Sequence, residues 1–310
     1  HQVMSEGVVR PGMVVVGADS HTCTLGALGA FATGVGATDM AAIWASGATW
    51  FRVPETIAVN LTGRLGGPAE PKDVALACVA RLGMEGATYR ALEFVGDGAS
   101  GISMDGRLTL CNMAVETGAK TGIFYADAVT VRHLAGHGVA ASPQAVEEPR
   151  YEREIAIDLS GIVPLVAVPH RVDTVREAED VAGTPIDQVF VGTCTNGRYE
   201  DLARLARIVR GRKVAVRTLV VPASRAVLAR AIATGVLADI VDAGCMVAPP
   251  GCGPCLGAHE GVMGEGEVCL STANRNFKNR MGVGAEIYLS SVATAAVSAL
   301  AGEIAVPEVA

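Results

Sequence analysis

The sequence has few aromatic and few charged residues, and it lacks a long hydrophobic run. Aromatic side chains make up 4% of the 310 residues, and charged side chains make up 18%. This low charge excludes a coiled coil, whose heptads need sustained charged positions. Half of the residues are hydrophobic, which excludes a disordered chain because so much apolar surface can offset chain entropy. No run reaches the roughly 18 apolar residues of a membrane helix, so we expect no membrane partner.

Clustered positive charge is also missing. The chain carries 25 Lys and Arg against 32 Asp and Glu, a net charge of −7, and the basic residues are scattered singly. A nucleic-acid partner needs a basic patch, so we expect none. The chain begins with His1 and shows neither an initiator Met nor a signal-like apolar segment. We therefore expect either a processed chain or a fragment of a longer one.

The eight cysteines are spread thinly over a long chain. Disulfide scaffolds are small and rich in cysteine, so reduced thiols and a cytoplasmic location are expected. Cys78 and Cys111 lie among Ala and Leu on helical faces, and we expect them to be buried as small apolar side chains.

Strands alternate with helices along most of the chain, which predicts an α/β fold with mostly parallel, helix-covered sheets. Three regions are expected: 1–55, 56–170 and 171–310. A helical, Gly- and Ala-rich stretch follows the first strand and is expected to reach about Phe51. The predicted strands are 14–16, 56–61, 91–95, 154–159, 163–168, 189–191, 214–221, 245–248, 268–270 and 286–289, and the other predicted helices are 72–82, 108–116, 199–209, 224–233 and 292–300. A polar loop is expected over 136–150.

Three loops with unusual residues follow predicted strands: 192–197, 249–257 and 271–280. In open α/β sheets, the loops beyond the carboxyl ends of the strands build the ligand crevice. Convergence of these three loops therefore predicts a ligand site.

Two short motifs invite other interpretations. The run 96–101 fits the glycine pattern of a dinucleotide loop, but Asp97 would place a negative charge against the phosphates, which favours a plain turn. The Cys252-Gly253-Pro254-Cys255 run matches the redox centre of thioredoxins. Those domains are small and usually place an aromatic residue just before the motif, whereas here two prolines and Gly251 precede it.

The cysteines of these loops also suggest metal chemistry. A structural zinc site would need Cys194 and either Cys245 or Cys269 in addition to the Cys252/Cys255 pair. Alternatively, Cys194, Cys252 and Cys255 could hold three corners of a [4Fe–4S] cluster and leave one iron without a protein ligand. Such an iron is a Lewis acid that can bind a substrate hydroxyl and carboxylate.

The ordered motifs resemble the aconitase superfamily, and within it the large subunits of 3-isopropylmalate dehydratase and homoaconitase. The matching runs occur in family order along the whole chain: 17–24, 26–39, 111–113, 192–197, 251–257, and 274–277 ending at Arg280. The resemblance implies three-layer α/β domains around a central cleft.

The same resemblance implies roles for individual residues. The cluster ligands are Cys194, Cys252 and Cys255. Two imidazole–carboxylate pairs are implied, one of His1 with Asp19 and one of His21 with Glu116, and such pairs fix tautomers and raise basicity. The remaining implied residues are the active-site contact Ser20, the residues around the cluster Asn112 and Asn274, and the carboxylate-binding Arg275 and Arg280.

The resemblance also implies an activity and a partner. The activity is that of a hydro-lyase that isomerises 3-isopropylmalate by dehydration and rehydration in leucine biosynthesis, with homoaconitate-type and methylmalate/citraconate-type substrates as alternatives. The catalytic base is expected on a small swivelling subunit of a hetero-oligomer. Large subunits of this family also carry about a hundred further residues upstream of the position that matches His1. We therefore expect the chain to be inactive without that segment and the small subunit.

Overall fold

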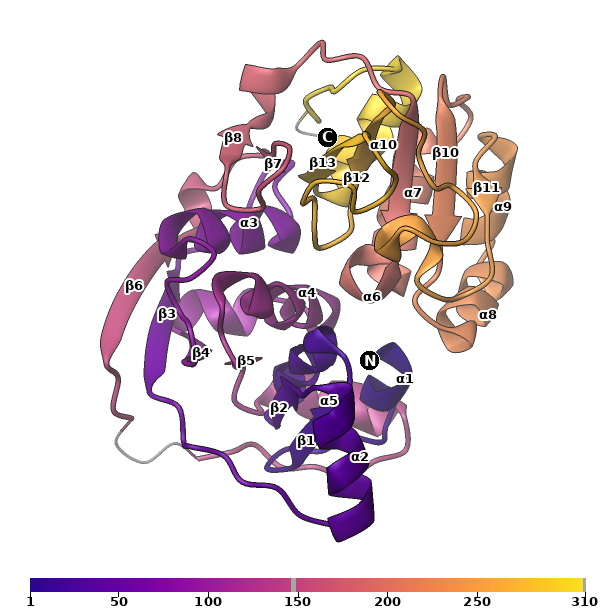
Figure 1. Cartoon of the computed structure of the whole chain (residues 1–310). Coiled ribbons are helices and arrows are strands. Elements are labelled where there is room, and N and C mark those ends of the chain that lie inside the picture. The colour runs from indigo at the N-terminus through magenta and orange to yellow at the C-terminus, as the bar shows by residue number, and fades with distance from the viewer. Residues whose placement is uncertain (146–148, 309–310) are drawn as a thin grey trace. The chain divides into compact units, whose positions relative to one another are not determined.

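The computed structural model describes residues 1–145 and 149–308 (Figure 1). Contacts divide the chain into two compact units, and neither unit is continuous in sequence. Unit 1 consists of His1–Arg64 and Leu82–Ser160, and unit 2 consists of Leu65–Arg81 and Gly161–Ala310. Within the described residues, no helix is both long enough and apolar enough to cross a membrane.

Unit 1 is built on parallel strands. Four of them form one sheet in the order β5 (Thr121–Ile123), β4 (Ala91–Val95), β3 (Thr56–Thr62), β6 (Arg153–Asp158), and two more, β1 (Val14–Gly17) and β2 (Phe31–Gly34), pair with each other. The α-helices of this unit are α1 (Gln2–Ser5), α2 (Ala37–Ser46), α4 (Met104–Ala114) and α5 (Ala128–Gly136), and its 3-10 helices are η1 (Ser20–Leu28), η2 (Asp97–Gly101) and η3 (Val115–Thr117).

The long 3-10 helix η1 positions the polar residues of unit 1. It begins where Asp19 accepts a hydrogen bond from the His21 amide, and it ends at Gly29, whose φ of 77° suits glycine. All of its residues after Ser20 are buried, and it packs against α4. A Cβ at Gly26 would collide with the Gly122 carbonyl, so only glycine allows η1 to approach β5 this closely.

Unit 2 carries, in its described part, a seven-stranded sheet. Its strand order is β11 (Met246–Val247), β10 (Arg217–Val221), β9 (Gln188–Gly192), β12 (Val268–Ser271), β13 (Glu286–Ser290), β7 (Leu165–Ala167), β8 (Val175–Glu177). The first five strands are parallel, and β7 and β8 add an antiparallel edge. The helices are α3 (Pro71–Leu82), α6 (Thr193–Asn196), α7 (Tyr199–Val209), α8 (Arg225–Ala233), α9 (Val236–Asp242) and α10 (Val292–Ala301), with the 3-10 helices η4 (Leu159–Gly161), η5 (Ala178–Val181) and η6 (Gly253–Leu256).

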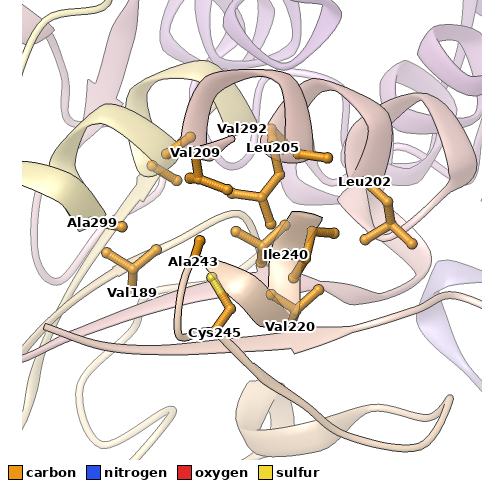
Figure 2. Close-up of a cluster of buried hydrophobic side chains, with 14 of the residues drawn as sticks. Val189, Leu202, Leu205, Val209, Val220, Ile240, Ala243, Cys245, Val292 and Ala299 are labelled. Atoms are coloured by element: carbon orange, nitrogen blue, oxygen red, sulfur yellow. The ribbon is translucent and has the colours of Figure 1, made fainter. Parts of the chain in front are cut away.

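The core of unit 2 lies between α7 and the sheet. Leu202, Leu205 and Val209 recur at helical spacing on one face of α7, and they pack with Val189 and Val220 of the strands beneath (Figure 2). Helices α9 and α10 pack against α7. This packing fixes the parallel strands of the sheet. Cys194 follows the carboxyl end of β9, Cys252 and Cys255 follow that of β11, and Asn274 follows that of β12.

The predicted α/β fold with mostly parallel sheets is confirmed. Helix α7 and strand β4 begin and end where the sequence predicts, and the other predicted strands and helices are found with shifted ends. The continuous helix to about Phe51 is wrong, because η1, β2 and α2 occupy that stretch and β2 pairs with β1. The loop expected over 192–197 contains the single-turn helix α6. Helices α5 and α9 and strands β2, β5 and β8 were not predicted.

Two further expectations concern boundaries. The polar loop expected over 136–150 begins at the end of α5, and its residues 146–148 lie outside the described residues. The division into 1–55, 56–170 and 171–310 stays a prediction. Contacts group the chain into two units, each discontinuous in sequence.

Candidate active site: an acid–base cluster and a thiol cluster

Asp19 organises one end of the acid–base cluster in unit 1. It follows β1 directly and caps η1, where its Oδ1 accepts from the His21 amide at 2.8 Å. The same Oδ1 lies 3.0 Å from His1 Nε2. A hydrogen bond from the His21 side chain lowers the pKa of Asp19 against the opposing effect of partial burial. Asp19 is therefore an ionised partner that orients the His1 imidazole.

His21 and Glu116 form the buried part of this acid–base cluster. Glu116 lies on η3, just after α4, and its Oε1 is 3.0 Å from His21 Nε2. Both side chains are 7% exposed. On the other side of the ring, Nδ1 lies 3.4 Å from Ser20 Oγ and 3.7 Å from Asp19 Oδ1. Because both ring nitrogens have polar neighbours, the orientation of the imidazole is fixed.

Asn112 has a supporting position in unit 1. It lies on α4, is fully buried, and donates from Nδ2 to Thr24 Oγ1 on η1 at 2.8 Å. Its carbonyl lies 3.7 Å from the Cys23 thiol. Asn112 thereby ties α4, which leads into Glu116, to η1, which carries His21.

Ser20 faces a different part of unit 1. It lines a cavity of about 690 Å³ together with Asp39 of α2, Trp50, Tyr89 and Lys120. This cavity places a serine hydroxyl, a carboxylate and an ammonium around one space that can admit a small polar molecule.

The thiol cluster of unit 2 consists of Cys194, Cys252 and Cys255, and two of its thiols lie beside one amide. Cys194 lies on α6, directly after β9, while Cys252 caps η6 and Cys255 lies within it. Asn274, which follows β12, places its Nδ2 3.9 Å from Cys194 Sγ and its Oδ1 3.9 Å from Cys255 Sγ. Nδ2 also donates to Thr195 Oγ1 at 2.9 Å, which fixes the orientation of the amide.

Two arginines lie close to this thiol cluster. Arg280 Nη2 is 4.0 Å from Cys255 Sγ. Burial raises the pKa of Cys255, the neighbouring Cys194 raises it further, and Arg280 lowers it. The buried Arg198 donates to the carbonyls of Cys194 and Thr195, which fixes the Cys194 loop. Arg275 is half-buried and directly follows Asn274.

The three cysteines are exposed to different degrees: Cys252 is exposed, Cys194 is intermediate and Cys255 is buried. All eight cysteines are free thiols, and Cys78 and Cys111 are buried as expected. In the described ranges, no three His, Cys, Asp or Glu side chains converge on a point that would suit a single metal ion. The predicted zinc set is therefore not assembled, and the Cys252 and Cys255 thiols are not bonded to each other.

The predicted site residues divide between the two units, and Arg275 is grouped with the thiols only by its position directly after Asn274. The residues of the acid–base cluster are His1, Asp19, Ser20, His21, Asn112 and Glu116, and those of the thiol cluster are Cys194, Cys252, Cys255, Asn274, Arg275 and Arg280. Sequence reasoning missed Thr24 and Thr195, which hold the two asparagines, and the buried cations Arg198 and Lys72. The charged residues within 70–73, at the start of a predicted helix, could have drawn attention to Lys72. Such a run is also typical of a helix end exposed to solvent, so it does not predict a buried lysine.

Comparison with known proteins assigns the family. The model of the aconitase family (aconitate hydratase) matches residues 1–182 and 174–302. The chain is 54% identical to the probable methanogen homoaconitase large subunit of Methanosarcina mazei, with 99% of this chain and 79% of that protein covered. It is 53% identical to 3-isopropylmalate dehydratase large subunit 2 of Archaeoglobus fulgidus, with 99% and 75% covered.

A solved structure agrees on the fold. The crystal structure of Thermococcus kodakaraensis aconitase X in its holo-form aligns with a TM-score of 0.53 at 14% identity, and the alignment covers 87% of this chain and 64% of that one. At this identity the likeness bears on the fold alone. The family match and the relatives at about half identity establish more: the chain belongs to the aconitase family.

Proposed function

We propose that the chain is the large subunit of a hydro-lyase that isomerises 3-isopropylmalate by removing water and adding it back at the neighbouring carbon. One observation carries the proposal: the chain of an aconitase-family protein holds both a buried imidazole–carboxylate pair, His21 with Glu116 at 3.0 Å, and a set of thiols in which Cys194 and Cys255 lie beside Asn274 and Cys252 neighbours Cys255. The first is suited to proton transfer. The second is suited to binding a cofactor that activates a hydroxyl.

The thiol cluster fits a [4Fe–4S] cluster better than it fits a single ion. Two of its thiols, those of Cys194 and Cys255, lie on either end of the Asn274 amide, and among the described residues they form no group suited to a single ion. Arg280 places positive charge beside Cys255. Gly253 adopts a φ of 52°, and a Cβ there would lie 2.9 Å from a Val221 methyl group, so the turn between Cys252 and Cys255 requires glycine. We propose Cys194, Cys252 and Cys255 as the ligands. When bound, such a cluster supplies a Lewis-acidic iron that weakens the bond to the substrate hydroxyl.

The acid–base cluster is proposed to hold and move the proton that accompanies water loss. Glu116 keeps one tautomer of His21 and stabilises its protonated form, and Asp19 does the same for His1. Ser20, beside His21 Nδ1, is a polar contact for substrate. The base that removes the carbon-bound proton is proposed to come from a small subunit, because the relatives with these motifs are named large subunits.

Arg275 and Arg280 are proposed to bind the carboxylates of a hydroxy-dicarboxylic acid. A planar guanidinium can donate two parallel hydrogen bonds to one carboxylate, which gives direction as well as charge. Asn112 and Asn274 are proposed to hold the surrounding groups in place.

The substrate is the finer part of the proposal. Relatives at 48–54% identity carry both names, 3-isopropylmalate dehydratase and homoaconitase, so a homoaconitate-type substrate is the second candidate. The larger share of the named relatives favours 3-isopropylmalate.

A reconstitution experiment tests the function. The chain, joined to the upstream segment that the family resemblance implies, would be purified anaerobically, analysed for iron and sulfide, and combined with the small subunit of a 3-isopropylmalate dehydratase. Formation of the unsaturated intermediate from 3-isopropylmalate would then be compared with turnover of homoaconitate and citraconate. We expect bound iron and sulfide, and a kcat/KM that is highest for 3-isopropylmalate. A preference for homoaconitate would overturn the substrate assignment, and a chain without iron and sulfide would overturn the cofactor assignment.

A further inference from the structure

Lys72, in the first turn of α3, is a charged residue that the proposed mechanism does not use. Its side chain is completely buried in unit 2. Burying an amine without partners is strongly unfavourable, so a lysine at such a position needs acceptors for its protons.

The partners of Lys72 are the two loops that position the thiol cluster. Its Nζ donates to the carbonyls of Thr272 and Ala273 at 2.7 Å each, and to Asn196 Oδ1 at 3.4 Å. Thr272 and Ala273 immediately precede Asn274, whose amide lies between two of the thiols. Asn196 is two residues after Cys194. An ammonium has three donors, so these three acceptors use all of them.

The charges around Lys72 include those same thiols. Burial lowers the pKa of Lys72 and the charges of Asp201, Asp73, Cys255 and Cys194 oppose that shift, which leaves the pKa at about 7. The interaction is reciprocal, because a positive charge at Nζ favours thiolates at Cys194 and Cys255 over neutral thiols. Arg280 has the same effect on Cys255 from the loop after Asn274.

We propose that Lys72 is a positioning residue for the cluster: its buried ammonium joins the Cys194 loop to the loop that carries Asn274, and it supplies positive charge to the cluster thiolates. This inference rests on the proposed [4Fe–4S] site. It assigns to a helix start, more than a hundred residues before Cys194 in sequence, the task of fixing two loops that the Asn274 amide also joins.

The neighbouring Glu70 provides a matched comparison. It precedes the same helix, and its carboxylate accepts from the Ala293 amide at 2.9 Å and pairs with Arg204 at 3.1 Å. Glu70 therefore also joins the start of α3 to other parts of unit 2. Its partners lie on α7 and α10, whereas those of Lys72 lie in the loops beside the thiols. Glu70→Gln replaces a buried carboxyl group of the same segment with an amide without touching the thiol loops.

The test compares reconstituted wild type, Lys72→Met, Lys72→Arg and Glu70→Gln. Lys72→Met keeps the length of the side chain and removes its charge and its donors. We expect it to bind iron and sulfide about 10–100-fold more weakly than wild type, on the scale of losing a group that orients metal ligands. We also expect a lower midpoint potential for any cluster that remains, because a nearby positive charge has been lost. Glu70→Gln should retain the wild-type affinity and potential, and Lys72→Arg should retain the potential.

The outcomes separate this inference from the proposed function. If wild type binds no iron and sulfide, the cofactor assignment fails and this inference fails with it. If wild type binds a cluster and Lys72→Met holds it equally well at an unchanged potential, only the role of Lys72 is overturned. The same follows if Glu70→Gln loses the cluster as readily as Lys72→Met. Should Lys72→Met not fold, Lys72→Gln, which donates without a charge, replaces it, and an unchanged midpoint potential in that variant would overturn the role.

Discussion

The acid–base cluster and the thiol cluster are held in place by different means. In unit 1, the functional side chains bond one another: His1 with Asp19, and His21 with Glu116. In unit 2, residues other than the thiols hold the loops in place. Arg198 and Lys72 donate hydrogen bonds to backbone carbonyls of the loops, and Thr195 accepts one from the Asn274 amide. Direct pairing fixes a tautomer, which is what a proton-transfer group needs. Bonding through the backbone fixes a loop and leaves the thiols available as ligands.

The largest expected effect is on the thiol cluster. Cys255→Ser removes a thiolate from the proposed ligand set, and iron, sulfide and visible absorption should fall to background after anaerobic reconstitution. Cys269→Ser is the matched control, because Cys269 is fully buried within β12 and its Sγ accepts from Gln188 Nε2 at 3.8 Å instead of facing Asn274. Full cluster content in Cys194→Ser or Cys255→Ser, together with loss in Cys245→Ser or Cys269→Ser, would show that the ligand set is wrong.

In the acid–base cluster, Glu116→Gln should reduce turnover strongly and leave cluster content unchanged. The glutamine can still accept a hydrogen bond from His21, but it no longer stabilises the protonated imidazole. We expect kcat, measured in the enzyme completed with the upstream segment and the small subunit, to fall by about 10²–10⁴-fold, the usual contribution of general acid–base catalysis. Glu154→Gln, at an exposed carboxylate that bonds Asn60, should behave as wild type. A Glu116→Gln enzyme with normal kcat would remove this pair from the mechanism.

Arg280→Lys tests whether charge alone suffices beside the thiol cluster. The lysine keeps the positive charge near Cys255 but loses the planar fork, so transition-state binding should weaken by about 1.5–3 kcal/mol, the value of a charged hydrogen bond. The measurement is kcat/KM with iron content as a check, and Arg210→Lys serves as the control because Arg210 makes an exposed ion pair with Asp239. Unchanged kcat/KM would assign Arg280 a structural duty.

The smallest expected effect concerns the stability of unit 1 and its dependence on pH. His133 Nε2 lies 2.9 Å from the Ser5 carbonyl, which ties α5 to α1. Burial lowers the pKa of His133 from its ordinary 6.5, so the unfolded chain binds this proton more tightly. The stabilisation from the neutral ring is complete above pH 6.5 and is lost as pH falls through the lower, folded pKa.

Urea titrations of wild type and His133→Gln across this range measure that contribution. The glutamine can donate to the same carbonyl and does not titrate, so the stability of the variant should decline less on acidification. Parallel pH profiles for the two proteins would contradict a shifted pKa at His133.

Much of the fold could be predicted because the deciding interactions are local. The spacing of Leu202, Leu205 and Val209 is sufficient to define α7, since it reports a single buried helical face. Strand β2 was missed because Phe31–Gly34 lies in a run of small residues without periodicity, and its pairing with β1 makes it a strand. The candidate loops were found because they follow strands, which is a rule of α/β topology.

The environment of the candidate site could be predicted only in part. The cysteines, histidines and arginines stand out by residue type and motif, and their catalytic roles stay predictions. Lys72 does not stand out, because a lysine in the first turn of a helix is usually solvated. Its burial depends on carbonyls 200 residues further along the chain, and no local pattern carries that information.

Residues 65–81 belong to unit 2, although the rest of that unit begins only at Gly161. This order has a consequence for synthesis on the ribosome. At roughly 5–20 residues per second, the carbonyls that accept from Lys72 emerge about 10–40 seconds after Lys72 itself. All residues of unit 1 have been synthesised once Ser160 is added. Unit 1 can therefore fold before the residues that bond the start of α3 have been made. A nascent chain thus carries a charged helix end without its acceptors for longer than most local folding events take, and expression at lower translation rates lengthens that exposure.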